Sequence, residues 1–162
     1  LYHGPLRLSR LLAKETIMND HTVKAFDDDL NRLRGLVSEM GSRAVVAVEN
    51  AVAALDARDT EAANRIVAED GRIDDLEAEI ERLVVQTIAL RAPMADDLRT
   101  MIAALKIAAV LERVGDYGKS IAKRVSLLTV DRSIDAIPLL RSMSDLVCEM
   151  LRDVLAAYAA QD

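Results

Sequence analysis

Apolar residues recur at steps of three and four along four long stretches of this chain, and few residues interrupt them. In the first stretch the series includes Phe26, Leu30, Leu33, Val37 and Met40. Such spacing places one apolar face along an α-helix, whereas a half-buried strand alternates at every second residue. Only six Gly and three Pro occur in 162 residues, and aromatic residues make up 2% of the chain. The pattern therefore predicts an all-α protein.

The breaks between these stretches are short, which restricts how the predicted helices can be connected. We expect helices over about residues 22–57, 60–90 and 93–128, and a fourth that starts between residues 133 and 138 and continues to the end of the chain. The segment DARDT ends the first helix, and RAPM forms the turn after the second. Short connections make successive helices antiparallel, so the first three are predicted to form an antiparallel three-helix bundle.

The fourth predicted helix resembles the first when the sequence is shifted by 103 residues. Leu36 then aligns with Leu139, and Met40 aligns with Met143, in the same helical phase. We interpret the fourth helix as the start of a second, truncated three-helix repeat. The predicted organisation is a leader-like or tag-like, non-native segment over residues 1–17, a first bundle over residues 18–129, and the first helix of the second repeat over residues 130–162.

Charge and cysteine content narrow the classes of function. The formal net charge is −6, and nucleic-acid binding requires clustered Lys and Arg, so we expect no nucleic-acid partner. The single cysteine, Cys148, cannot form an internal disulfide, which fits a reducing compartment. No apolar run reaches the 18 residues expected of a membrane-spanning helix. These features favour a soluble protein.

The third predicted helix carries acidic residues in line with its apolar ones. Its bundle-facing seam is predicted to contain Leu98, Ile102, Leu105, Ala109, Glu112 and Asp116. An ionised carboxylate in a core costs several kcal/mol unless it is paired or bound to a metal. Gly115 and Gly118 lie in the same stretch, and we expect them to allow either close helix packing or the close approach of a metal cluster.

A second pair of carboxylates lies on the preceding helix at a matching height. Asp70 and Asp74 precede Ala92, in the turn, by 22 and 18 residues, and Glu112 and Asp116 follow it by 20 and 24. At about 1.5 Å rise per residue, the two pairs lie within about 3 Å of one level on antiparallel helices. Four ionised carboxylates at one level require a cation, and all-oxygen ligands suit magnesium, manganese, calcium or ferric iron. The alternatives are a solvated acidic face and ion pairs with Arg72, Arg99, Arg113 or Lys119.

The residue types also limit the chemistry that the chain can perform. His3 and His21 lie outside the predicted helical core, which argues against di-iron oxygen activation and against zinc hydrolysis. The sequence contains no phosphate-cradling glycine loop and no candidate Ser-His-Asp set. We therefore expect a non-enzymatic, metal-binding adaptor. A carboxylate-bridged metalloenzyme and a structural helical scaffold without metal are the alternatives.

The two most specific segments of the chain are LRAPMADDLR and LERVGDYGKSIAKR. Together with the residues around them, over 69–124, they resemble the PhoU family, the accessory regulators of bacterial phosphate transport. Gly118 and Ser120 stand where the family often has Ala and Asn. Members of the family are two similar three-helix bundles, each with Asp/Glu-x-x-x-Asp pairs that bind metal clusters. The resemblance carries that role onto Asp70, Asp74, Glu112 and Asp116, with Glu69 and Asp97 as lesser candidates.

The resemblance implies further properties. The metal would be iron, manganese, magnesium or zinc, with a multinuclear cluster as one form. The protein would be a cytoplasmic negative regulator that contacts the phosphate transporter's ATPase and a sensor histidine kinase, and that meets the membrane only through these partners. Because the fourth helix would lack the two helices that cover it in the family, we expect this chain to be a homo-oligomer, with exchange of that helix between copies as one route.

Overall fold

The computed structural model describes residues 5–128 and 135–160, with side chains from residue 24 onward. All regular secondary structure in these residues is helical, which confirms the predicted all-α class. The predicted boundary at residues 129–130 lies outside the described part of the chain. The helices are α1 (Pro5–Ala57), α2 (Thr60–Glu69), α3 (Gly71–Arg91), α4 (Ala95–Val125) and α5 (Ile137–Ala160).

The helix boundaries differ from the prediction in two places. α1 begins at Pro5 rather than near Thr22, because proline suits the first turn of a helix and good helix formers follow it. The second predicted helix is in fact two helices, α2 and α3, which meet at Asp70. Asp70 keeps helical dihedral angles (φ −58°, ψ −37°), so the chain bends there without forming a loop.

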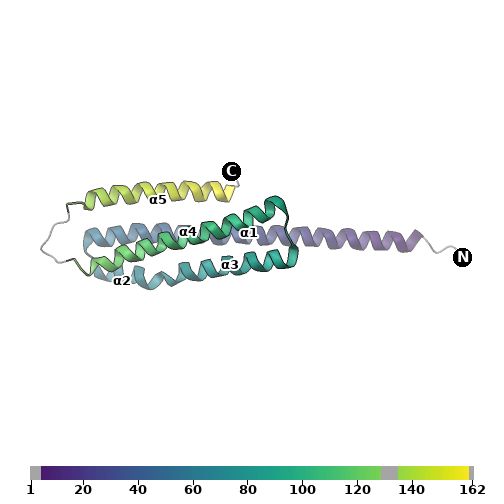
Figure 1. Ribbon diagram of the computed structural model, residues 1–162, viewed down its shortest axis with the longest axis horizontal. Coiled ribbons are helices and arrows are strands. Elements are labelled where there is room, and N and C mark those ends of the chain that lie inside the picture. The colour runs from purple at the N-terminus through teal and green to yellow at the C-terminus, as the bar shows by residue number, and fades with distance from the viewer. Residues whose placement is uncertain (1–4, 129–134, 161–162) are drawn as a thin grey trace.

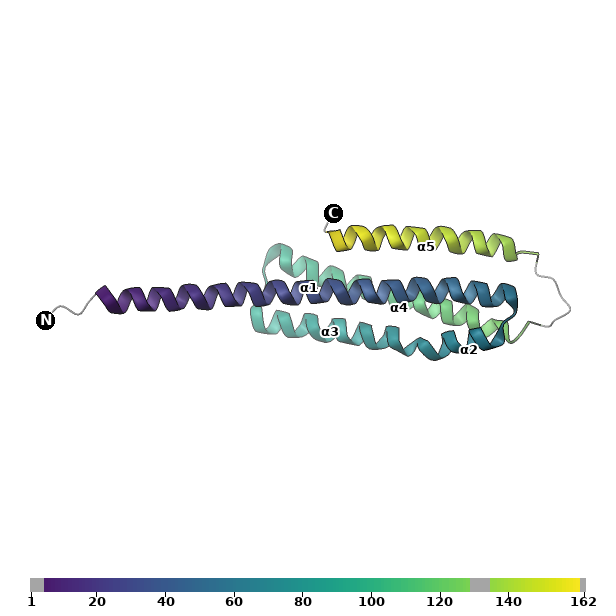
Figure 2. The ribbon, with the colours of Figure 1, turned by 180° about the vertical axis from the view of Figure 1, so that it is seen from behind.

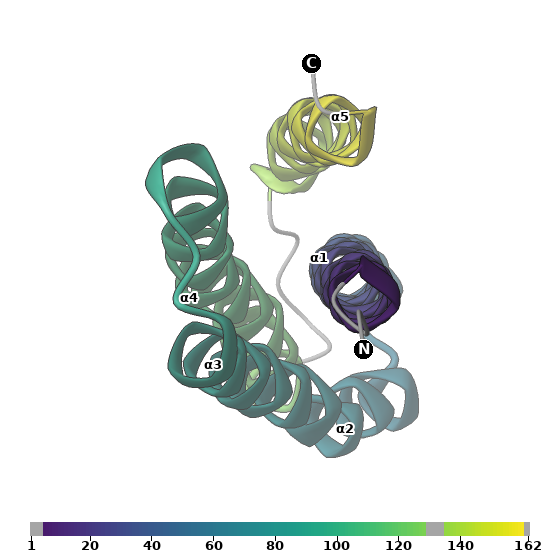
Figure 3. The ribbon, with the colours of Figure 1, turned by 90° about the vertical axis from the view of Figure 1, so that its right-hand side faces the viewer.

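The helices form an antiparallel bundle with α5 added at one side. α2 and α3 together run opposite to α1 and to α4, α5 runs opposite to α4, and the first part of α1 extends beyond its neighbours (Figure 1). α5 lies alongside α1 when the molecule is seen from behind (Figure 2). Seen end-on, α1 lies between α5 and α2, with α3 and α4 to one side (Figure 3). The predicted three-helix bundle with a fourth long helix is therefore confirmed, with the second helix bent.

The buried face of α4 is offset from the predicted seam, so that part of the prediction is wrong. Leu98 and Ile102 are 36% and 40% exposed, and Asp116 is exposed. The offset arises because small side chains let α4 approach its neighbours closely, a packing effect that apolar spacing alone does not reveal. The buried residues of α4 are Met101, Ala104, Ala108, Leu111, Gly115, Gly118, Ala122 and Val125.

The two glycines of this face lie where helices approach most closely. A Cβ atom on Gly118 would lie 3.0 Å from the carbonyl carbon of Ala47 and 3.1 Å from the backbone nitrogen of Val48 on α1. A Cβ atom on Gly115 would lie 2.7 Å from the Cδ1 atom of Ile73 on α3. Of the two roles expected for these glycines, close helix packing is the one that the structure supports.

The contact between α1 and α5 follows the predicted repeat. The guanidinium of Arg152 pairs with the carboxylate of Glu49, and the thiol of Cys148 faces the carbonyl oxygen of Val45 at 3.9 Å; the residues of each pair are 103 positions apart. Because α1 and α5 run in opposite directions, contacts between repeat-related residues indicate an approximate two-fold axis between the helices. This is the arrangement that the predicted repeat requires of α5.

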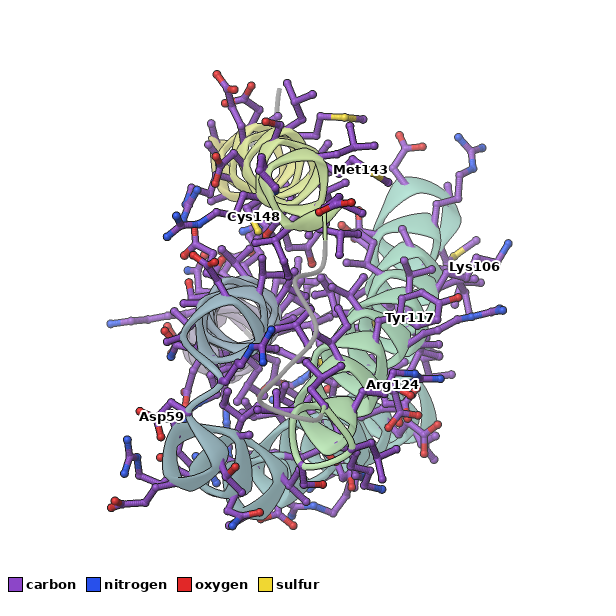
Figure 4. All side chains as sticks on the ribbon, turned by 90° about the vertical axis from the view of Figure 1, so that its left-hand side faces the viewer. Asp59, Lys106, Tyr117, Arg124, Met143 and Cys148 are labelled. Carbon is purple, nitrogen blue, oxygen red and sulfur yellow. The ribbon has the colours of Figure 1, made fainter. Side chains whose placement is uncertain are left out.

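The repeat also explains the exposed apolar residues of α5. Met40 on α1 is completely buried against α3 and α4, whereas its counterpart Met143 is 53% exposed. Ala44 is completely buried, and its counterpart Val147 is 46% exposed. Figure 4 shows Cys148 on the side of α5 that faces α1 and Met143 on a different side. The α5 stripe, which has no helix over it in the described residues, comprises Leu139, Met143, Leu146, Val147, Met150 and Val154.

Candidate functional site

Asp70 is the most buried of the predicted site residues. It lies at the bend between α2 and α3, and its side chain is 6% exposed. The ammonium group of Lys119 on α4 donates a hydrogen bond to its Oδ2 atom. That hydrogen bond is the main reason why the pKa of Lys119 is raised above its ordinary value. The bend in the second predicted helix thus places a buried carboxylate against α4.

The other three principal candidates lie on α3 and α4, which pack against each other. Glu112 on α4 is half-buried, and Asp74 on α3 and Asp116 on α4 are exposed. Burial raises the pKa of Glu112, and the neighbouring carboxylates of Asp116, Glu77 and Asp74 raise it further, in that order. Asp74 on α3 therefore lies close enough to Glu112 on α4 to affect its pKa. We call Asp74, Glu77, Glu112 and Asp116 the acidic cluster.

Glu77 is a member of the acidic cluster that the sequence-based site prediction omits. Burial raises its pKa, and the nearby carboxylates of Glu81 and Asp74 add to the effect. Glu77 follows Asp74 by three residues, so it belongs to the same acidic stripe of α3. The spacing could have identified it, but nothing in the sequence shows that this stripe turns toward Glu112.

Lys119 connects the acidic cluster to Asp70. Its Nζ atom lies 3.7 Å from the Oδ1 atom of Asp116, in addition to its hydrogen bond with Asp70. Its side chain is 28% exposed, so the ammonium group is partly shielded from water. One of the four ion-pairing partners considered from the sequence, Lys119, is thus the residue that neutralises the buried carboxylate.

The two lesser candidates lie away from the acidic cluster. Glu69 is exposed, and it lines a groove of about 360 Å³ between α1 and the α2–α3 bend, together with Asp70. Asp97 is exposed in the first turn of α4. It precedes Asp116 by 19 residues on the same helix, a separation of about 28 Å. The structure therefore brings neither residue into the acidic cluster.

The side chains as placed are not arranged around a metal ion. Among the described residues, no group of three or more His, Cys, Asp or Glu side chains could hold one. The chemistry of the donors nevertheless suits a hard cation, because every candidate ligand is a carboxylate oxygen. The carboxylate of Asp70 is paired with Lys119.

The fold and sequence match known proteins. A family model described as the PhoU domain matches residues 37–125. The chain is 51% identical over 142 residues to the phosphate-specific transport system accessory protein PhoU homolog of Zymomonas mobilis. The aligned region covers 88% of this chain and 60% of that protein. The corresponding homologue from Caulobacter vibrioides is 44% identical over 146 residues, with 90% and 64% covered.

Two solved structures share the architecture. The phosphate transport system regulatory protein PhoU from Streptococcus pneumoniae matches with a TM-score of 0.78 at 30% identity, over 85% of this chain and 64% of that one. PhoU from Pseudomonas aeruginosa matches with a TM-score of 0.65 at 28% identity, over 88% and 66%. The chain spans 60% to 64% of the length of the two curated relatives named above. The family model, the relatives and the structures together show that this chain belongs to the PhoU family.

Proposed function

We propose that this protein is a negative regulator of phosphate uptake and of the phosphate-starvation response. The observation that carries the proposal is the 51% identity, over 88% of this chain, to a relative named as an accessory protein of phosphate-specific transport. The proposed mechanism is contact with the ATPase of the phosphate transporter and with a sensor histidine kinase. The protein acts as an adaptor and not as an enzyme, in keeping with the accessory and regulatory names of its relatives.

The cytoplasm is the proposed compartment, because a transporter's ATPase and a kinase's catalytic part both face it. Within the described residues, no helix has both the length and the apolar character needed to cross a bilayer. We propose that the protein meets the membrane through its two partners.

A reporter assay tests the regulatory function. The chain is expressed in bacteria that lack their own PhoU protein and carry a phosphate-starvation reporter. Repression of the reporter in phosphate-rich medium supports the proposal. A reporter that stays active, in cells where immunoblotting shows this chain at the level of a functional full-length relative, contradicts it for the chain as it stands.

We also propose that the acidic cluster, together with Asp70, binds iron, manganese, magnesium or zinc. One observation supports this proposal: burial raises the pKa of Glu112, and the nearby carboxylates of Asp116, Glu77 and Asp74 raise it further. A cation that binds only the folded chain stabilises it by about 2.7 kcal/mol at a hundredfold excess over its dissociation constant. Two outcomes of metal analysis and chelator melts would contradict the proposal: protein purified without chelator that carries no metal, and a melting temperature that added Mn²⁺ leaves unchanged.

A third proposal concerns assembly. We propose that the α5 stripe lies at a contact between two copies of the chain. Six large apolar residues on one helix, each 46% to 67% exposed, form more apolar surface than an isolated soluble chain usually leaves in water. Exchange of α5 between copies remains the route that requires least change, because α5 would keep its contact with an α1 helix.

A further inference from the structure

Lys119 lies between Asp70 and Asp116, where a cation shared by these two carboxylates would have to bind. Its ammonium group hydrogen-bonds to Asp70 at the α2–α3 bend and lies 3.7 Å from Asp116, one turn earlier on α4. Asp70 is 6% exposed at its side chain, so an ionised carboxylate there must be paired. Lys119 is the group that meets this requirement.

A metal ion that joins Asp70 to Asp116 and the ammonium group of Lys119 would occupy the same space. A hard cation binds carboxylate oxygens at about 2.0–2.6 Å, closer than a hydrogen-bonded nitrogen. A cation that joins Asp70 to Asp116 would therefore lie within contact distance of the Nζ atom of Lys119, and two positive charges there repel each other. The exposed part of the Lys119 side chain gives it a route into water.

We propose that Lys119 is a built-in competitor for the cation, and that a metal ion gains Asp70 as a ligand only when the ammonium group leaves it. The inference rests on the proposed metal binding by the acidic cluster. It adds that the affinity for the metal is set in part by a residue that is not a ligand.

Three variants of Lys119 separate competition from a structural role. Lys119→Met removes the charge and keeps most of the aliphatic stem, and Lys119→Gln retains a hydrogen-bond donor for Asp70 without the charge. Lys119→Arg keeps the positive charge. Lys123→Met is the matched control, because it removes one positive charge from an exposed position one turn further along α4. It therefore corrects for the general change in the electrostatic field.

The readout is Mn²⁺ affinity, measured from the electron paramagnetic resonance signal of free Mn²⁺. We expect Lys119→Met and Lys119→Gln to bind Mn²⁺ about tenfold more tightly than Lys123→Met, the effect of an interaction that shifts a pKa by one unit. Lys119→Arg should bind no more tightly than the parent. A purely structural ion pair would instead give a lower melting temperature with unchanged or weaker Mn²⁺ binding.

The outcomes distinguish this inference from the proposal on which it rests. If the parent binds Mn²⁺ and neither neutral variant exceeds Lys123→Met, the competition is overturned and metal binding stands. If only the neutral variants bind, the competition holds and metal binding by the parent fails. If no variant binds although circular dichroism shows that each is folded, both are overturned.

Discussion

At the scale of single residues, the negative charge of Glu112 is expected to destabilise the fold of the metal-free protein. Its pKa is raised above the ordinary value of 4.5 by burial and by three neighbouring carboxylates. Below pH 4.5 the group is largely neutral in both the folded and the unfolded chain, so it costs little. As the pH rises from 4.5 through the higher pKa that Glu112 has in the folded state, Glu112 loses its proton more readily in the unfolded chain than in the folded one. The free energy of unfolding therefore falls over this range.

Replacement of Glu112 by Gln should therefore stabilise the metal-free protein at pH 7 and have almost no effect near pH 4. The measurement is a pair of thermal melts in the presence of chelator at the two pH values. Asp75→Asn, an exposed change on α3 outside the acidic cluster, serves as the control. A gain from Glu112→Gln that is equal at both pH values would show that repulsion among the carboxylates is not its cause.

Gly118 gives a second prediction at the same scale. In Gly118→Ala the new methyl group meets the backbone of α1 at 3.0 to 3.1 Å, where no flexible side chain can move aside. We expect the free energy of unfolding to fall by about 1–3 kcal/mol, the usual cost of overpacking. Gly35→Ala is the control: it has open space around it in α1, and the change should raise stability by up to about 1 kcal/mol. Chemical denaturation that shows Gly118→Ala to be as stable as Gly35→Ala would contradict the close packing of α4 on α1.

At the scale of elements, the contact between α5 and α1 can be monitored by the rate at which Cys148 reacts with a thiol reagent. Cys148 is completely buried between the two helices, and burial raises the pKa of its thiol. Leu155 contacts the α1 backbone at Gly41. Leu155→Ala should therefore loosen α5 and speed the reaction of Cys148 with a thiol reagent, whereas Leu139→Ala, at a position 63% exposed, should not. Equal labelling rates in the two variants would show that α5 does not open as a unit.

The elements also show what spacing in a sequence can and cannot predict. Helical periodicity identified all four apolar stretches, because it depends only on the order of residues along one chain. It could not identify the bend at Asp70, whose own dihedral angles are helical and whose carboxylate pairs with Lys119 on a different helix. The buried face of α4 was missed for a related reason: Gly115 and Gly118 are buried for their lack of volume and not for their hydrophobicity.

The same distinction applies to the candidate site. Distance from the turn is enough to place Asp74 level with Glu112, because rise per residue is nearly constant in a helix. The basic residue that neutralises Asp70 is decided by proximity in the folded chain. The sequence alone did not distinguish among the four basic residues considered as partners. The structure selects Lys119. Whether Asp70, Asp74, Glu112 and Asp116 bind a metal remains a prediction.

At the scale of the whole molecule, the α5 stripe predicts concentration-dependent association. We expect sedimentation velocity to show a dimer at micromolar concentrations. Val147→Glu places a charge within the stripe and should shift the chain toward monomer. Val85→Glu, at a position on α3 that is 64% exposed, is the matched control and should leave the dimer intact. A parent chain that remains monomeric at high concentration would contradict the assembly proposal.

The proposed regulatory function requires that this chain recognise a phosphate transport system. The most direct measurement is the binding of the purified chain to the purified ATPase subunit of a phosphate transporter, by surface plasmon resonance, with the full-length Zymomonas mobilis relative as the positive control. We predict that both proteins bind the subunit and that each competes with the other. Binding by the relative without any binding by this chain, when circular dichroism shows the chain to be folded, would contradict the proposed contact with the transporter's ATPase.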